Sequence, residues 1–228
     1  MYLPLKADFH IHTKEDRLDS IPHGAREIID KAHEKGFQVI SITNHDTLTF
    51  SNNLRDYAEE RGILLIPGIE ATIQGRHVLL LNVDWVVHKI KTFSDLRHNK
   101  RKDSLVIAPH PYFPHPRSLH SQLENNIDIF DAIEYSHFYT KRINFNSMAS
   151  AKAEQYQLPM VGTSDAHMML QLGTTYSMVY AEKRDVGSVV NAVKEGRIEV
   201  VTQPLELSQF IKVFMKLIAH YIIYCLRI

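Results

Sequence analysis

The chain has 228 residues, with 26 basic and 26 acidic side chains, 44% hydrophobic residues and 23% charged residues. This composition is typical of a globular protein and excludes a disordered or fibrous chain. A formal charge of zero argues against a protein that holds nucleic acid mainly through a basic surface. The single cysteine, Cys225, allows neither an internal disulfide nor a zinc site made of cysteines. The first residues lack the features of a signal peptide, so we expect a cytoplasmic protein.

Short apolar runs alternate along the chain with longer helix-like segments. We predict strands at residues 7–12, 38–43, 64–70, 105–109, 132–136, 160–164 and 176–180, and an additional strand at 77–83 after the turn Gln74-Gly75. We predict helices at residues 25–35, 54–61 and 144–157, each ending beside a glycine or proline.

This alternation predicts an α/β protein with seven or eight parallel strands. A spacing of about 30 residues between strands favours a closed or nearly closed barrel over an open sheet. No glycine-rich phosphate loop follows a strand, which counts against a dinucleotide-binding fold.

The composition changes after Pro204, and we place the only domain boundary there: a barrel domain at 1–204 and an apolar C-terminal helix at 205–228. Lys212, Lys216, His220 and Arg227 interrupt the apolar residues, which argues against a membrane-spanning helix. Docking on the barrel, on a second subunit in a homo-oligomer, or on a membrane surface stay open as alternatives.

The predicted strand ends carry most of the chemistry in this sequence. Of the 14 histidines, six lie at or just after such ends, in the company of carboxylates. In chain order these residues are Asp8, His10 and His12, then His45 and Asp46, Glu70, His110, His137, and finally Asp165 and His167. In a barrel of parallel strands these ends meet at one mouth. Imidazole and carboxylate groups that converge there predict a site for several divalent ions.

The spacing within the first strand supports this interpretation. His10 and His12 are two residues apart, so both side chains point to the same face of a strand. Such a pair often has no functional role, and alone it is weak evidence for a metal site. The same residue types recur at six strand ends, and chance would have to place them there six separate times. We therefore prefer the interpretation as a metal site.

The motifs DFHIHT, SITNHDT, PGIEA, APHP, EYSH and GTSDAH, in this order, resemble the PHP (polymerase and histidinol phosphatase) superfamily. The resemblance covers about residues 6–203. It implies a distorted, TIM-like (βα)7 barrel with two or three metal ions at the C-terminal face of the strands, acting usually as a phosphoesterase.

The resemblance also implies the ligand sets. The first ion would be held by His10, His12, Glu70 and Asp165; a second would share Glu70 and add His110 and His137. A third would take His45, His167 and an acidic residue of the loop KEDRLDS, for which we choose Asp19 over Asp16. The sequence departs from the family pattern at Asn44, where an aspartate is more common, which removes a carboxylate that could orient a ligand.

Such a centre predicts an anionic substrate, because three divalent ions outweigh three carboxylates in charge. Bound metals lower the pKa of water from about 15.7 towards about 7, so a metal-activated hydroxide could attack phosphorus in a phosphate mono- or diester. Either Asp46 or water would protonate the leaving group. Zinc, manganese and iron all suit the ligands.

Basic residues in loops that follow strands are candidates for binding the phosphate: Lys14, Arg117, Lys141 and Arg142. Phe113 and Tyr139 lie in the same loops and could stack on a base or form a pocket wall. The basic run at 97–102 precedes a strand, so we interpret it as a solvated turn on the opposite face.

The substrate would be a phosphorylated small molecule or a nucleic-acid end, without a stable nucleic-acid complex. Two other functions stay open: an amidohydrolase-type metal hydrolase, and a non-enzymatic, metal-stabilised module recruited by its C-terminal helix. An amidohydrolase would carry a metal-bridging lysine at a middle strand, whereas this chain has Glu70 early and the Asp165–His167 pair late.

Overall fold

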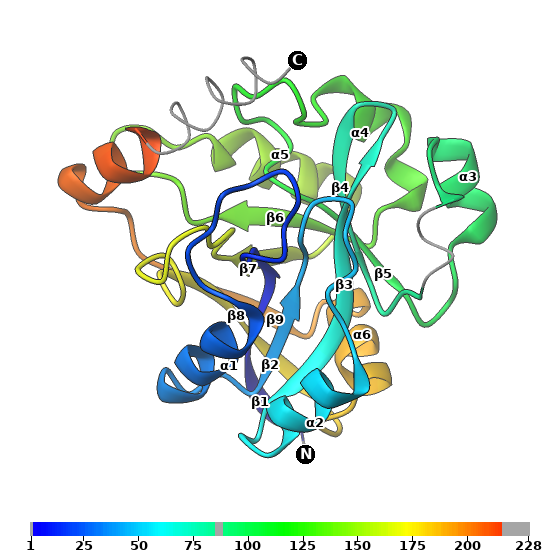
Figure 1. The fold of residues 1–228 in the computed structure, drawn as a ribbon. Coiled ribbons are helices and arrows are strands. Elements are labelled where there is room, and N and C mark those ends of the chain that lie inside the picture. The colour runs from blue at the N-terminus through cyan, green and yellow to red at the C-terminus, as the bar shows by residue number, and fades with distance from the viewer. Residues whose placement is uncertain (1, 85–88, 216–228) are drawn as a thin grey trace.

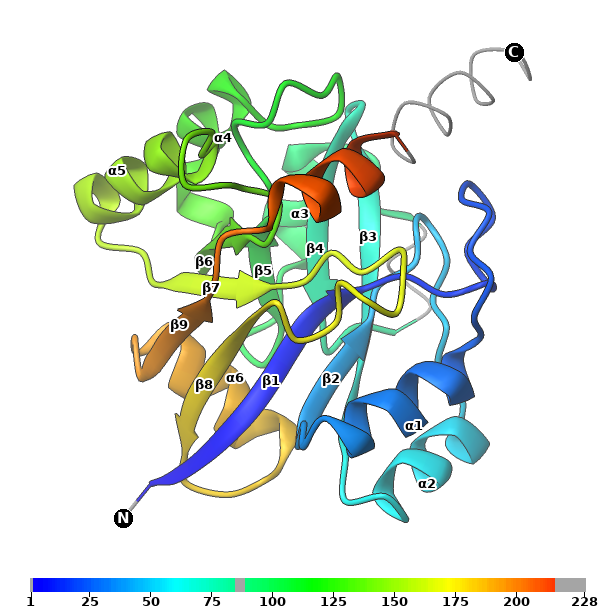
Figure 2. The ribbon, with the colours of Figure 1, turned by 90° about the vertical axis from the view of Figure 1, so that its left-hand side faces the viewer.

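The computed structural model describes residues 2–84 and 89–215, and within these ranges nine strands form one sheet (Figures 1 and 2). The order across the sheet is β7-β6-β5-β4-β3-β2-β1-β8-β9. The strands are β1 (Leu3–Ile11), β2 (Val39–Ile42), β3 (Leu64–Ile73), β4 (Arg76–Leu81), β5 (Leu105–Ala108), β6 (Ala132–Ser136), β7 (Met160–Thr163), β8 (Thr175–Ala181) and β9 (Ile198–Thr202). The eight predicted strands are therefore confirmed, and β9 was missed.

The prediction that all the strands are parallel is wrong. β4 runs antiparallel to both of its neighbours, β3 and β5, and β8 runs antiparallel to β1. The reason for the first reversal is the two-residue turn Gln74-Gly75, with φ of 47° and 76°. Turns with both central residues at positive φ join adjacent antiparallel strands.

The sheet nearly closes on itself because β7, at one end of the strand order, lies against β8 and β9 at the other end. Gly162 in β7 makes this approach possible, since a Cβ there would lie 2.6 Å from the carbonyl oxygen of Tyr176. The Ser177 hydroxyl donates a hydrogen bond of 2.9 Å to the Gly162 carbonyl across the same seam. The predicted α/β barrel is thus confirmed.

Helices cover the outside of the barrel (Figure 1). They are α1 (Ala25–Glu34), α2 (Asn52–Glu59), α3 (Phe93–Asn99), α4 (Ser121–Asn125), α5 (Asn146–Tyr156) and α6 (Val186–Lys194). In α1, Ile28, Ile29 and Ala32 are buried at helical spacing, and the chain leaves the helix at Gly36 with φ of 72°. The three predicted helices are confirmed to within about two residues at each end.

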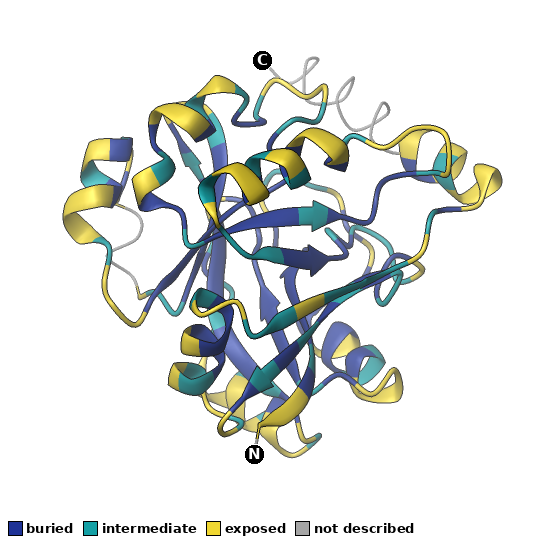
Figure 3. Ribbon diagram, turned by 180° about the vertical axis from the view of Figure 1, so that it is seen from behind, coloured by how far each residue is buried: buried dark blue, intermediate teal, exposed yellow. Residues whose placement is uncertain are grey.

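The core fills both the inside of the barrel and the space beneath the helices (Figure 3). β1 passes through it with five consecutive buried residues from Ala7 to Ile11. The site residues near the end of β1 are thus attached to a buried part of the strand.

The C-terminal segment lies over the barrel beside the loop that follows β7 (Figure 2). Residues 207–215 are helical, and Phe210 stacks on Phe138 with ring centroids 4.4 Å apart. The second part of the predicted helix at 205–228 lies outside the described residues. It comprises residues 216–228, with Lys216, His220 and Arg227. Among the described residues no helix combines the length and apolar character needed to cross a membrane.

The basic run at 97–102 is neutralised by nearby acids. Arg97 pairs with Asp128 and Lys100 with Asp131, each at 2.7 Å. Residues 97–99 form the last turn of α3, and residues 100–102 lie in the predicted turn before β5, at the end of that strand opposite the histidines.

Candidate metal centre

The barrel brings most of the predicted ligand side chains together, although they come from strands far apart in the sequence. His10 lies in β1, His12 follows its end, and Glu70 lies within β3. The others follow β2, β5, β6 and β7: His45, His110, His137, Asp165 and His167.

Three of the residues at these strand ends have unusual backbone angles. Asp46, His110 and Asp165 have φ of 47°, 27° and 43°. Non-glycine residues adopt positive φ at an energetic cost, and such residues concentrate at functional sites. The strain turns the chain sharply where the strands end.

Glu70 is the centre of the cluster and is almost completely buried. Five imidazole nitrogens surround its carboxylate. They belong to His10, His12 and His45, at 3.3, 3.2 and 3.0 Å from Oε2, and to His77 and His110, at 2.8 and 3.2 Å from Oε1.

The Nε2 atoms of His10 and His12 lie close together, next to two carboxylates. These atoms are 3.0 Å apart, and Asp165 Oδ1 lies 3.3 and 3.4 Å from them. Two ligands about 2.0–2.2 Å from one ion lie roughly 3.3 Å apart at tetrahedral angles. His10, His12 and Glu70 form one group of donor atoms close enough to hold an ion, and Asp165 forms two further groups, with His10 and His110 and with His12 and His167.

Carboxylates behind the histidines fix their orientation. Glu134 Oε1 lies 2.8 Å from Nδ1 of His10, and Asp16 Oδ2 lies 3.0 and 2.9 Å from Nδ1 of His12 and His45. When Nδ1 donates its proton to such a carboxylate, Nε2 keeps its lone pair for the centre. The donor set therefore fits divalent metal ions.

The electrostatics of the metal-free centre lead to the same conclusion. Burial alone would lower the pKa of His10 and His12, but the carboxylates around them raise both well above the ordinary value. Burial would likewise raise the pKa of Glu70, but the surrounding histidines hold it well below its ordinary range. The carboxylates thus keep a positive charge in the centre, and a metal ion would replace protons there.

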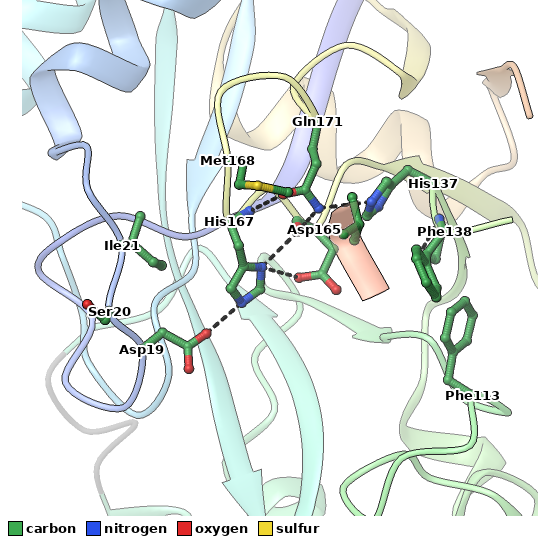
Figure 4. Close-up of a pocket in the computed structure, with 12 residues that line it drawn as sticks. Asp19, Ser20, Ile21, Phe113, His137, Phe138, Asp165, His167, Met168 and Gln171 are labelled. Atoms are coloured by element: carbon green, nitrogen blue, oxygen red, sulfur yellow. Dashed lines mark hydrogen bonds and ion pairs between the residues drawn. The ribbon is translucent and has the colours of Figure 1, made fainter. Parts of the chain in front are cut away.

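Asp19 and Asp16 occupy different places. Asp19 Oδ2 lies 2.6 Å from His167 Nε2 and 3.9 Å from His45 Nδ1, at the rim of a pocket (Figure 4). Asp16 lies deeper, between His12 and His45. The choice of Asp19 over Asp16 as the ligand of a third ion, with His45 and His167, stays a prediction, and Asp16 is a second carboxylate of the same centre.

His137 does not join the other predicted ligands in this structure. Its Nε2 is 2.9 Å from the side-chain amide nitrogen of Gln171, and Nδ1 is buried without a hydrogen-bond partner among the described residues (Figure 4). Burial lowers its pKa to about 4, so the ring is neutral. His77 lies instead beside the Glu70 oxygen that His110 also approaches.

Three residues of this centre were missed or set aside by the sequence reasoning: His77, Glu134 and Asp16. His77 had a usable signal, because the turn Gln74-Gly75 sets it opposite Thr72 and therefore on the face that carries Glu70. Glu134 also had a usable signal, because it is a carboxylate within a mainly apolar strand.

The predicted phosphate-binding residues lie apart from the pocket lining: Lys14, Arg117, Lys141 and Arg142. Lys14, Lys141 and Arg142 are exposed, and Arg117 donates a hydrogen bond to Thr72 Oγ1 at 3.2 Å. Their role stays a prediction. Asp46 is also exposed, and its Oδ1 accepts a hydrogen bond from the Thr72 N–H at 2.7 Å.

Comparison with known proteins shows which family the chain belongs to. A family model described as PHP-associated matches residues 144–198. An uncharacterized protein from Methanocaldococcus jannaschii is 30% identical over 159 residues, which are 65% of this chain and 91% of that protein. The chain belongs to the PHP superfamily. The resemblance drawn from the six motifs is therefore confirmed.

Solved PHP-like structures share the fold. One is a two-domain protein from Bacteroides vulgatus that contains a predicted PHP-like metal-dependent phosphoesterase, with a TM-score of 0.67 and 21% identity, covering 94% of this chain and 70% of that one. Another is the lesion-specific endonuclease Q from Pyrococcus furiosus, with a TM-score of 0.61 and 16% identity. It covers 87% of this chain and 58% of the endonuclease.

Proposed function

We propose that the protein is a metal-dependent phosphoesterase that hydrolyses a phosphate mono- or diester. The observation that carries this proposal is that Nε2 of His10 and Nε2 of His12 each lie within 3.4 Å of both Glu70 Oε2 and Asp165 Oδ1, backed by orienting carboxylates. In the reaction, water adds to phosphorus, the bond from phosphorus to the ester oxygen breaks, and the alcohol leaves with a proton.

The first ion would be held by His10, His12, Glu70 and Asp165, and the distances from the two histidines to the two carboxylates support this set. A second would be held by Glu70 with His110, together with His77 or His137, and a third by His45, His167 and Asp19. When bound, two or three ions of zinc, manganese or iron supply positive charge to the phosphoryl oxygens and make hydroxide available at neutral pH.

The chain's own residues have three tasks in this proposal. Glu134 and Asp16 hold the imidazoles so that Nε2 points inward. Asp165 and His167, at the pocket, define where the phosphoryl group lies. Asp46 is our candidate for protonating the leaving group, supported by its strained backbone directly after His45.

Two substrate classes are compatible with this centre: a phosphorylated small molecule and a nucleic-acid end. The structurally similar endonuclease Q has been seen with a duplex that carries an abasic lesion at its active site. The limited size of the pocket, about 70 Å³, favours the small molecule.

The test measures hydrolysis of p-nitrophenyl phosphate and bis-p-nitrophenyl phosphate by protein loaded with manganese, zinc or iron. We expect His10→Ala and Asp165→Ala to abolish turnover, and His98→Ala, a change at an exposed histidine of α3, to leave it intact. Equal rates in all four proteins would remove the proposal. Turnover of amides or lactones alone would favour the amidohydrolase alternative.

A further inference from the structure

The pocket beside the centre, about 70 Å³ in volume, has two unlike walls (Figure 4). One wall is polar and carries Asp165, His167 and Asp19. The other is mainly apolar and is made by Phe113, Phe138, Met168 and Val213, although the polar residues Ser136, His137 and Gln171 also line the pocket.

The residues of the apolar wall follow the same strands as several residues of the charged centre, with one addition from the C-terminal segment. Phe113 follows β5, Phe138 follows β6 and Met168 follows β7. Val213 comes from the C-terminal segment and is only 3% exposed. Three loops and the tail thus meet at one side of the pocket.

The tail is held in place where it reaches the pocket. The Leu205 N–H donates a hydrogen bond of 2.8 Å to the Tyr139 carbonyl, and Leu205 is buried. Phe210 stacks on Phe138 with the ring planes 9° apart. One turn further on, Val213 is therefore positioned as part of the wall.

A phosphate ester, like the pocket, has a charged part and an organic part. Its phosphoryl group is anionic and belongs beside the polar wall, and its organic group then faces the apolar wall. The pocket volume of about 70 Å³ includes the space beside the polar wall, so the organic group that fits against the apolar wall is short.

We propose that Phe113, Phe138, Met168 and Val213 form a subsite for the apolar organic group of the phosphate ester, with Val213 of the C-terminal segment as its specificity-determining residue. This inference rests on the proposed function. The subsite selects esters of small apolar alcohols over those of polyols or sugars, because a polyol would lose hydrogen bonds to water against this wall.

The experiment compares kcat/KM for n-butyl phosphate and glycerol 3-phosphate in the metal-loaded full chain. Butoxide is no better as a leaving group than the glycerol alkoxide, so a preference for the butyl ester reports binding. We expect a preference of about 10- to 200-fold, the range found when small hydrophobic groups are discriminated. Val213→Asp is expected to remove this preference, because the apolar contact with the butyl group is lost.

Ile211→Asp is the matched control, because this aliphatic residue lies on the same helix and is 50% exposed. It should keep the butyl preference. Met168→Gln alters the same wall from the loop after β7 and serves as the second variant where Val213→Asp fails to fold.

A binding measurement separates this inference from the proposed function. Calorimetry with n-butylphosphonate and methylphosphonate should show tighter binding of the butyl compound to the wild type and equal binding to Val213→Asp. Hydrolysis of both esters at equal rates by the wild type overturns the subsite and leaves the phosphoesterase standing. If no ester is hydrolysed, the proposed function fails, and equal binding of the two phosphonates then overturns the subsite as well.

Discussion

The two sides of the barrel mouth are built on different physical principles. On one side, Glu70 and Asp165 face imidazoles at about 3 Å, and each contact joins groups of complementary charge. On the other side, Phe138, Phe210 and Val213 pack through apolar contacts. Both sides draw on the segments that follow β5, β6 and β7, and the apolar side also includes the C-terminal segment.

This difference suits the charged side to the chemical step and the apolar side to the selection of the substrate. Buried charges are tolerated only when each has its partner, so the charged side admits few substitutions. Apolar surfaces accept changes of size and shape more readily. We therefore expect substitutions on the charged side to affect every substrate, and substitutions on the apolar side to affect the choice among substrates.

The largest effect is expected from Glu70→Gln. The amide has one acceptor oxygen in place of two and places an N–H among five imidazoles. Loss of metal affinity and activity should exceed the roughly 100-fold effect typical of residues that only orient a ligand. Elemental analysis and turnover measure this, with Glu124→Gln, an exposed carboxylate beside Lys152, as the control. Full metal content in the Glu70 variant would contradict the central role of this residue.

A smaller effect is expected from Glu134→Gln. Glu134 faces Nδ1 of His10 and also accepts hydrogen bonds from the His110 N–H and the Thr163 hydroxyl. Because it acts through His10, its loss should reduce metal affinity by about 10- to 100-fold. A metal titration measures the shift, and saturating metal should restore much of the activity. A variant that stays inactive at saturating metal would place Glu134 in the chemistry itself.

Much of the charged side could be predicted from the sequence, because strand ends in a barrel meet whatever the details of the strand order. His10, His12, Glu70 and Asp165 needed only the alternation of strands and helices and the period of two along a strand. His77 needed the register of the hairpin as well, and that register depends on reading Gln74-Gly75 as a tight turn.

The apolar side could not be predicted in the same way. Phe113 was considered as a pocket wall, but nothing in the sequence places Val213 beside it. The tail is apolar around much of its circumference, with Leu207 and Ile211 exposed and Val213 buried. Its pattern therefore does not say which face packs on the barrel, and only tertiary packing decides this.

The smallest effect concerns stability, and it distinguishes the two sides by pH. Asp8 lies beneath the charged side, fully buried in β1, where burial raises its pKa to about 7, although it accepts hydrogen bonds from the His10 and Ser164 N–H groups. The folded protein thus binds this proton more tightly than the unfolded chain, whose Asp pKa is about 3.9. The associated stability is present below that value and is lost as the pH rises through about 7.

Asp8→Asn removes this titration, so the variant should gain stability over the wild type as the pH rises. Between about pH 5 and about pH 9 the advantage should grow by roughly 2 to 3 kcal/mol, since each pKa unit corresponds to about 1.4 kcal/mol. Leu205→Ala is the counterpart on the apolar side. It removes buried methyl groups and should cost about 2 to 5 kcal/mol, equally at both pH values. Urea unfolding of the three chelator-treated proteins at the two pH values measures the six free energies, and a constant gap between Asp8→Asn and wild type would show that Asp8 is already ionised at the lower pH.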